Sequence, residues 1–474
     1  MCGAKLNSNT TRIIVVIAVV VVIACGVGAF LLMNQSSDDS TKNIDAALEV
    51  YGNADNDYKI DSKDLDIINK IIKSESGYTL EKYPLADAYK DGVVDQKDVE
   101  QVETIIKGVE DGKQITVWHL NHTTDLTKYP TGSYVADTKW PITKTIANGA
   151  ANSLTLYEMV GLKDNIVGIN YSKSSPPDKI VYPTYAAMTS LGSSTTSLTD
   201  DLVIDCIKAN PGTSAVITAD NKSYISNEDH IETDLKLDVV RIQHAAVDPE
   251  EHASAILLLG FLFQKETKAE QVAEWTTSVY KEIDKRLESV TDKIRVASSS
   301  GEKYLSARNS DYADVAVQAG GTYTLWEQSS ASIYFKEYKG SSKTYEPDPR
   351  VFEPEHQPDK IICLRTGAFL GSMANGASWY GSPDLWDVEK MKAYVEDFEV
   401  FNCYTGKNVT VISGDIPIVI RVLYSAVALY PDLVSKEYAD EKHQEFVDTF
   451  LGGAYKVKDC HFIFTQEEIE KMKG

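Results

Sequence analysis

Apolar and polar residues in the middle of the chain follow two alternating patterns, one with helical spacing and one of short apolar runs. Leu154, Tyr157 and Val160 recur at helical spacing, a glycine follows, and a short apolar run comes next. This order predicts a helix, a glycine turn and a buried strand. Residues 200–219 repeat the order, and residues 237–245 predict a further strand. Since strands that alternate with helices form mostly parallel sheets, we predict an open α/β region.

A long helical stretch divides this region into two blocks. Residues 248–290 have helical composition almost throughout, and apolar runs typical of strands reappear after them. We therefore predict an α/β fold in which two Rossmann-like lobes are joined by a long helix. The predicted bounds are 115–265 for the first lobe, 266–292 for the linking helix and 293–474 for the second lobe.

One uncharged apolar run, residues 13–33, dominates the amino-terminal region. About 20 apolar residues are enough to cross a bilayer as one helix. Two basic residues precede the run, and basic residues flank the cytoplasmic side of membrane helices. We therefore predict a cytoplasmic tail (1–12), a single-pass transmembrane anchor, a linker (34–45) and an extracellular remainder. The alternative is a cleaved lipoprotein signal at Cys25, although the apolar run continues beyond that cysteine.

The formal net charge of −23 argues against nucleic acid or an anionic membrane surface as a partner, because both require clustered lysine and arginine. The sequence has no nucleophile-elbow, zinc-protease or phosphate-loop motif, so we predict no enzymatic activity. His119 and His122 could contact a metal or a haem, but such a pair on an early strand is more typical of a solvent-facing position.

Two similar acidic segments, residues 53–64 and 87–98, follow the linker, and each precedes a stretch with helical periodicity. Oxygen-bearing side chains occupy alternate positions in both. A Ca²⁺ ion takes six to eight oxygen ligands, and a curled loop presents them from alternate residues. The sequence therefore predicts two structural Ca²⁺ sites. Their ligands are Asn53, Asp55, Asp57, Asp61 and Asp64 with the carbonyl of Lys59 in the first loop, and Asp87, Asp91, Asp95 and Asp98 with the carbonyl of Val93 in the second.

The paired loops resemble a dockerin, a duplicated calcium module that docks onto cohesin domains in some systems. The resemblance covers residues 46–110 and depends on aspartate, instead of glutamate, at the last loop positions, Asp64 and Asp98. Tyr58 and Tyr89 depart from the pattern, because they replace a glycine and a ligand. The resemblance implies a small all-α, EF-hand-like pair and a cohesin-like domain as a partner. A stalk without a partner, or two helix starts capped by aspartate, are the alternatives.

From Ile115 onward the chain resembles the helical-backbone class of substrate-binding proteins, the periplasmic-binding family of the iron-siderophore, haem and cobalamin ABC importers. The matching segments are Ala151–Tyr171, the Asn210-Pro211 break with the strand after it, Leu257–Val272, Asp311–Gly321 and Leu429–Gly452. Gly212 stands where the family usually has aspartate, so no permease-docking residue is assigned. The resemblance implies a membrane-anchored extracellular receptor that captures a metal chelate, above all a ferric siderophore, and delivers it to an ABC permease.

Three other functions stay open. The first is a receptor of the same family for cobalamin, another corrinoid or haem. The second is a cell-surface assembly protein that acts through dockerin–cohesin docking. The third is an enzyme on the same scaffold, similar to the chelate-handling relatives of nitrogenase.

The ligand is expected in a cleft between the lobes, because open α/β sheets bind ligands beyond the carboxyl ends of their strands. Aromatic side chains suit a planar or catecholate ligand, and arginine suits an anionic one. For any single aromatic residue, ordinary packing or surface exposure is the alternative. The candidate ligand-binding residues are Tyr171, Tyr182, Tyr185 and Asn221 in the first lobe, and Tyr304, Arg308, Trp326, Arg365, Trp379 and Tyr380 in the second.

Overall fold

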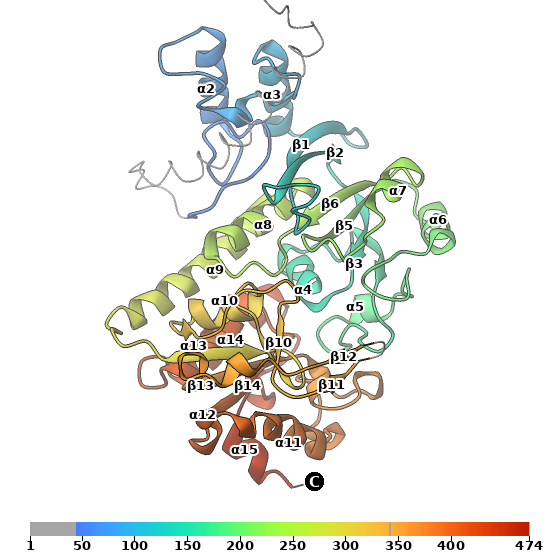
Figure 1. The fold of residues 1–474 in the computed structure, drawn as a ribbon. Coiled ribbons are helices and arrows are strands. Elements are labelled where there is room, and N and C mark those ends of the chain that lie inside the picture. Colours follow the sequence, from blue (N-terminus) through green and yellow to red (C-terminus); the bar gives the residue numbers. More distant parts are fainter. Residues whose placement is uncertain (1–43, 341–342, 474) are drawn as a thin grey trace, which may run out of the picture. The chain divides into compact units, whose positions relative to one another are not determined.

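The computed structural model describes residues 44–340 and 343–473 (Figure 1). The predicted cytoplasmic tail and transmembrane anchor therefore lie outside the described residues. Within the described ranges, no helix combines the length and the apolar character that crossing a membrane requires. Contacts divide the chain into two compact units, which meet in sequence between Pro141 and Ile142.

The first unit contains the two acidic loops, each followed by a helix. The helices are α2 (Ser62–Ile72) and α3 (Gln96–Lys107), with a short helix η1 (Pro84–Ala86) between them. Both begin with the same capping box, formed by Asp61 and Asp64 in α2 and by the equivalent aspartates in α3. Ile68 and Val102 lie in the small apolar core between the helices. The predicted duplication of a loop and a helix is therefore present.

An antiparallel hairpin, β1 (Ile115–His122) and β2 (Ser133–Trp140), completes the first unit. The predicted first lobe begins at Ile115, but this hairpin lies in the first unit because its edge pairs with residues before the acidic loops. The Tyr51 N–H donates to the Trp118 carbonyl at 2.8 Å, and the Leu120 N–H donates to the Glu49 carbonyl at 3.0 Å.

His119 and His122 have separate partners in this hairpin. The Nε2 atom of buried His119 lies 2.9 Å from the Thr138 hydroxyl, and burial lowers the pKa of His119 to about 4. The Nε2 atom of His122 lies 2.5 Å from a Glu49 carboxylate oxygen. Each imidazole already has a neighbouring partner of its own. The geometry therefore does not favour a metal site shared by His119 and His122, which was considered from the sequence.

The second unit begins with a four-stranded parallel sheet in the order β4-β3-β5-β6. Apolar residues such as Ile146, Val216 and Val239 fill its core. The predicted helix, glycine turn and strand are confirmed, because α4 (Ala151–Val160) ends at Gly161 in a left-handed conformation with φ +82° and β4 (Ile166–Asn170) follows. The elements are β3 (Lys144–Asn148), α4 (Ala151–Val160), β4 (Ile166–Asn170), α5 (Pro183–Ala186), α6 (Asp200–Ala209), β5 (Thr213–Ala219), α7 (Glu228–Thr233) and β6 (Asp238–Ile242).

Two helices follow this lobe, α8 (Pro249–Leu262) and α9 (Glu266–Leu287). The predicted linking helix, 266–292, corresponds to α9. This helix packs against α4 of the first lobe and α13 (Ile418–Leu429) of the second (Figure 1). A Cβ atom at Gly260 would lie 2.2 Å from the Cβ of Ala269, so glycine permits the close approach of α8 and α9.

The second lobe has its own five-stranded sheet in the order β15-β14-β13-β7-β9. Only β15 runs antiparallel to its neighbour. The sheet strands are β7 (Arg295–Ser299), β9 (Thr322–Tyr323), β13 (Lys360–Arg365), β14 (Val409–Ser413) and β15 (Ile463–Thr465); β8 (Tyr304–Ser306) pairs with β10 (Ser332–Tyr334), and β11 (Tyr338–Lys339) pairs with β12 (Thr344–Tyr345). The helices are α10 (Asp311–Gln318), α11 (Val388–Glu396), α12 (Asn402–Thr405), α13 (Ile418–Leu429), α14 (Lys436–Phe450) and α15 (Gln466–Lys471), and the short helices are η2 (Pro349–Phe352), η3 (Pro354–His356), η4 (Gly367–Phe369), η5 (Met373–Asn375), η6 (Pro383–Leu385), η7 (Asp397–Val400) and η8 (Val457–Asp459).

Candidate functional site

A cavity of about 280 Å³ lies between the two lobes of the second unit. Segments that follow strands line it from both sides: residues 149–152 after β3, 172–178 after β4, 366–367 after β13 and 414–415 after β14. The cavity therefore lies beyond the carboxyl ends of both parallel sheets, where the sequence analysis expects the ligand.

Arg421 contributes a positive charge to the cavity wall. It lies in α13, all twelve residues of which are buried, and only 4% of Arg421 is exposed. Its Nε atom donates to the Ile416 carbonyl at 2.8 Å, and its guanidinium also donates to the Asn152 side chain of the other lobe. Among the described residues it forms no ion pair with a carboxylate. The carboxylates of Asp311 and Asp415 are close enough to interact electrostatically with this guanidinium, but neither forms an ion pair with it, so an anionic ligand can bind the guanidinium directly.

The amino terminus of α4 adds to this positive potential. Ala150 occupies the N-cap position, and its methyl side chain makes no capping hydrogen bond. Ala151 and Asn152 of the first turn line the cavity. The first N–H groups of a helix lack partners within the helix and carry partial positive charge. An uncapped helix start next to a buried guanidinium is therefore a suitable place for an anionic group.

Two carboxylates also face the cavity. Asp415 accepts a hydrogen bond from the Gly367 N–H at 2.7 Å, and burial raises the pKa of Asp415 to about 6. Asp178 accepts from the Ile180 N–H at 2.7 Å and from the Ser378 hydroxyl of the second lobe. The cavity thus contains both a fixed positive charge and carboxylates, one of which titrates near neutral pH.

His244 is electrically neutral at physiological pH. Its Nδ1 atom lies 2.6 Å from the Ser153 hydroxyl, and burial, with a smaller effect from Arg421, lowers the pKa of His244 to about 4. Tyr224 packs edge-on against the imidazole at a centroid distance of 5.5 Å. The imidazole can therefore contact a ligand without adding charge to the cavity.

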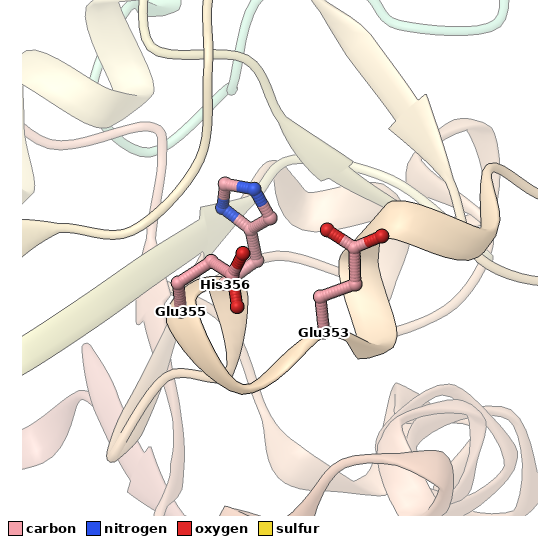
Figure 2. A group of neighbouring side chains, drawn as sticks. All are labelled: Glu353, Glu355 and His356. Atoms are coloured by element: carbon pink, nitrogen blue, oxygen red, sulfur yellow. The ribbon is translucent and has the colours of Figure 1, made fainter.

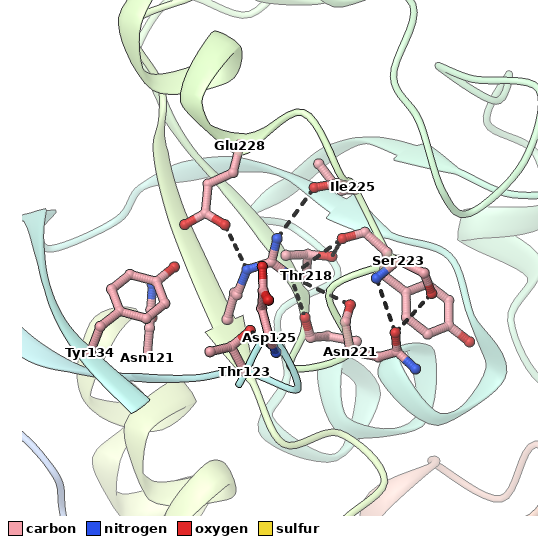
Figure 3. A network of polar contacts seen from close by, with 12 residues as sticks. Asn121, Thr123, Asp125, Tyr134, Thr218, Asn221, Ser223, Ile225 and Glu228 are labelled. Carbon is pink, nitrogen blue, oxygen red and sulfur yellow. Dashed lines mark hydrogen bonds and ion pairs between the residues drawn. The ribbon is translucent and has the colours of Figure 1, made fainter. Parts of the chain in front are cut away.

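A buried arginine, Arg241, positions the loop that carries Tyr224, and Figure 3 shows two of its partners, Glu228 and Ile225. Its Nε atom forms an ion pair with Glu228 at 2.7 Å, and its guanidinium donates to the carbonyls of Ala219 at 2.9 Å and Ile225 at 3.3 Å. These contacts tie both ends of the loop after β5 to one side chain, so we assign Arg241 a positioning role.

Two of the predicted ligand-binding residues line the cavity. The hydroxyl of Tyr182 lies 2.6 Å from that of Thr155, and the hydroxyl of Tyr380 donates to the Asp415 carbonyl at 2.7 Å. Both tyrosines lie in segments that follow a strand of their own lobe, as the prediction assumes. Tyr224 and Tyr312 add two further aromatic side chains that the sequence analysis omitted.

The other eight predicted residues lie outside this wall because they have partners elsewhere. Tyr185 and Trp379 are fully buried in the packing of their lobes. In the first lobe, the Tyr171 hydroxyl donates to the Met188 carbonyl, and the exposed Asn221 side chain accepts from Ser223. In the second lobe, the Tyr304 hydroxyl lies 2.8 Å from that of Ser300, and Arg308 forms an ion pair with Asp314. Trp326 packs on His356, and the Arg365 guanidinium lies over the Tyr394 ring.

Sequence reasoning missed Arg421, His244 and Asp415. Arg421 carried a usable signal, because it is the only charged residue in the apolar stretch 418–429. His244 and Asp415 follow predicted or observed strands, so the rule that selected tyrosines could have selected them.

The two acidic loops of the first unit have matching conformations. Asp64 accepts hydrogen bonds from the backbone of Asp55 and Asp61 at 3.1 and 2.7 Å, and its counterpart, the last aspartate of the second loop, accepts equivalent bonds at 2.8 and 2.7 Å. Asn56 and Lys90 both have positive φ at the same loop position. Each loop is therefore curled around its final carboxylate.

The first loop also contains a buried side-chain oxygen that accepts no hydrogen bond. Asn53 is fully buried, and its side-chain nitrogen donates to the carbonyls of Leu48 and Asp57 at 2.7 and 2.6 Å. Its Oδ1 atom has no hydrogen-bond partner. Burial, with the charges of Asp55 and Asp57, raises the pKa of Asp64 to about 8. The carboxyl and amide oxygens of this one short loop form a donor set that fits Ca²⁺.

No protein-family model and no curated protein matches this sequence. Several solved structures are similar. An ABC transporter solute binding protein from Sulfurospirillum deleyianum has 14% identity and a TM-score of 0.47, covering 67% of this chain and 93% of its own. The TroA-like periplasmic binding protein FepB from Veillonella parvula has 15% identity and a TM-score of 0.48, covering 73% and 99%. The molybdate periplasmic binding protein MolA from Haemophilus influenzae has 13% identity and a TM-score of 0.48, covering 68% and 96%.

Proposed function

We propose that this protein is the extracellular substrate-binding component of an ABC importer and that it captures an anionic metal chelate, with ferric siderophores as the preferred class. The observation that carries this proposal is the buried guanidinium of Arg421, which forms no ion pair among the described residues, beside the uncapped start of α4 in a cavity between two α/β lobes. Delivery requires an ABC permease as the partner, and residues 13–33 supply the membrane anchor.

The size and the lining of the cavity favour one chelate class over the others. Small-molecule pockets typically measure about 300–1,000 Å³. A cavity of about 280 Å³ lies just below this range, so it favours a compact chelate over haem or a corrinoid. Four tyrosines in the wall supply rings that can pack against aromatic chelating groups.

Capture without reaction is favoured over an enzymatic role. Ser153 pairs with His244, an arrangement that resembles part of a nucleophilic site. Only 1% of Ser153 is exposed, and the residue does not line the cavity. Its hydroxyl therefore cannot reach a bound molecule, and the pair serves to orient the imidazole.

The two acidic loops are proposed to bind one Ca²⁺ each, with the oxygen ligands given in the sequence analysis. The alternation of ligands, the matching loop conformations and the unpartnered Asn53 oxygen support this proposal. The calcium-loaded pair then forms a compact module that follows the anchor. For this module, a role as a stalk is preferred to cohesin docking, because a stalk needs no further partner.

A ligand panel tests the transport proposal directly. The full-length protein is mixed with a ferric catecholate siderophore, haem or cobalamin, and the complexes are measured by native mass spectrometry. We expect a one-to-one complex with the ferric siderophore and weaker binding of the two larger ligands. Binding of a peptide or a sugar, with no binding of any metal complex, would contradict the proposal.

Ligand affinity is expected to rise as the pH falls from 7.5 to 5.5. The pKa of Asp415 is raised to about 6 in the free protein, so its carboxylate gains a proton across this window. The neutral carboxyl of Asp415 no longer repels an anionic ligand bound beside Arg421. Because protonation and binding then favour each other, the dissociation constant at pH 5.5 is expected to be roughly threefold to tenfold lower than at pH 7.5. Titrations with a chelate of constant charge, followed by tyrosine fluorescence, measure this change.

The control for this pH dependence is a second aspartate outside the cavity. Asp415→Asn should flatten the profile, because the amide cannot titrate and can still accept from the Gly367 N–H. Asp384→Asn, at an exposed position, should leave the profile unchanged. A profile that stays steep in Asp415→Asn assigns the titration to another group.

A further inference from the structure

A proline-rich turn in the second lobe brings an imidazole and two carboxylates together. The segment 346–358 contains four prolines, and η3 within it places Glu353, Glu355 and His356 side by side (Figure 2). One ligand atom from each side chain lies within 4.8 Å of the other two. None of the three lines the cavity between the lobes. The group is therefore separate from the proposed chelate site.

The hydrogen bonding of His356 prepares it as a metal ligand. Its Nδ1 atom lies 2.7 Å from the Thr324 carbonyl, which can only accept, so Nδ1 carries the proton. The lone pair of the neutral ring is then on Nε2. The Trp326 ring packs edge-on at a centroid distance of 4.6 Å and holds the imidazole in place. Metal-binding histidines typically donate their second ring N–H to a carbonyl or carboxylate in this way.

Neither glutamate forms an ion pair among the described residues, although the Arg350 guanidinium, which lies 4.2 Å from the centroid of the Trp326 ring, attracts Glu353 electrostatically. Arg350, the nearest arginine in sequence, pairs with Asp348 at 2.5 Å. Arg295 reaches the turn, but it donates to the backbone carbonyls of Pro354 and Glu355, both at 2.8 Å. Two neighbouring carboxylates thus stay available, and a cation bound between them would relieve their repulsion.

We propose that Glu353, Glu355 and His356 bind one divalent cation of the Zn²⁺ class, with Co²⁺ and Ni²⁺ as substitutes. An imidazole with two carboxylates suits these metals, whereas Ca²⁺ and Mg²⁺ prefer oxygen ligands alone. Bonds of about 2.0–2.2 Å would place the ligand atoms roughly 3.4 Å apart. Small rotations of the two exposed glutamate side chains can close the present spacing. Three protein ligands leave one coordination position open to water.

Binding of Zn²⁺ to the full-length protein tests this proposal. The titration contains excess Ca²⁺, so that the acidic loops of the first unit are saturated. We expect native mass spectrometry to show one bound Zn²⁺ per chain, and Co²⁺ to give the visible absorption of a four- or five-coordinate ion. His356→Ala and Glu355→Gln should each weaken Zn²⁺ binding at least about tenfold, because each removes a ligand.

A second histidine provides a matched control. His230 lies between Asp200 and Asp234, with both ring nitrogens already bound at 2.9 and 2.6 Å, so it has no free lone pair. His230→Ala should therefore leave Zn²⁺ binding unchanged. Glu355→Gln decides the question if His356→Ala disturbs the turn, since Glu355 is exposed. Equal Zn²⁺ affinity in Glu355→Gln and the unaltered protein, or absence of Zn²⁺ binding, would overturn the proposal.

Discussion

Replacing Arg421 with glutamine is expected to weaken chelate binding at least about 100-fold. Arg421 is the buried cation of the cavity, and it forms no ion pair with a carboxylate among the described residues. A bound anion would receive charge-assisted hydrogen bonds from its guanidinium, which contribute about 1.5–3 kcal/mol each. Loss of about 3 kcal/mol corresponds to a factor of roughly 100 in the dissociation constant. Fluorescence titration with a ferric siderophore measures the change.

The same substitution should not destabilise the protein. The substitution removes the desolvation penalty of the buried guanidinium but also its attraction to the carboxylates of Asp311 and Asp415, so the midpoint of urea unfolding is expected to stay nearly constant. A loss of binding together with unchanged stability would separate a ligand-binding role from a structural one.

Arg308→Gln is the matched control for this experiment. Arg308 lies in the same lobe, pairs with Asp314 at 2.7 Å and does not line the cavity. It was a ligand-binding candidate on sequence grounds, and the geometry now predicts full binding in its variant. Equal losses in both variants, or full binding in Arg421→Gln, would contradict the assignment of Arg421.

Addition of Ca²⁺ is expected to increase the stability of the first unit strongly. A ligand present at 1,000 times its dissociation constant stabilises the folded state by about 4 kcal/mol per site. Because the loops lead into α2 and α3, amide hydrogen exchange in both helices should slow by roughly 1,000-fold when 1 mM Ca²⁺ replaces a chelator. Mass spectrometry of peptic fragments from the full-length protein measures this exchange.

Aspartate variants give this prediction its control. Asp57→Ala combined with Asp91→Ala removes one proposed ligand from each loop and should abolish most of the Ca²⁺ effect. Asp66→Ala removes an exposed aspartate that pairs with Lys70 on α2, and should preserve the effect. Equal protection with and without Ca²⁺ in the unaltered protein would exclude structural calcium sites.

Local patterns predicted most of the elements correctly. The helix, glycine turn and strand around Gly161 depend on spacing within about twenty residues, and the structure confirms all three parts. The linking helix and the two separate sheets also follow from local periodicity. The hairpin β1–β2 was placed in the wrong block because its partners, residues 49–51, precede it by a whole module. Pairing between distant segments has no local signature.

The ligand-binding residues were harder to predict than the elements. Tyr182 and Tyr380 line the cavity, whereas Tyr185 and Trp379, their close neighbours in sequence, are buried inside the lobes. A step of one to three residues along the chain can turn a side chain from the cavity toward the interior of the lobe. The amino-acid composition of a segment does not indicate this direction. Arg421 lies on a helix after β14, so a rule based on strand ends did not reach it.

The sequence by itself determined the α/β class, the two lobes and the duplicated acidic loops, because each depends on spacing between residues close in the chain. Tertiary structure alone decided which charges meet. Asn152 reaches Arg421 from the other lobe, and Thr324 sets the tautomer of His356 from another segment. Such contacts join residues far apart in sequence, and their energies depend on burial and distance, which exist only after the chain has folded.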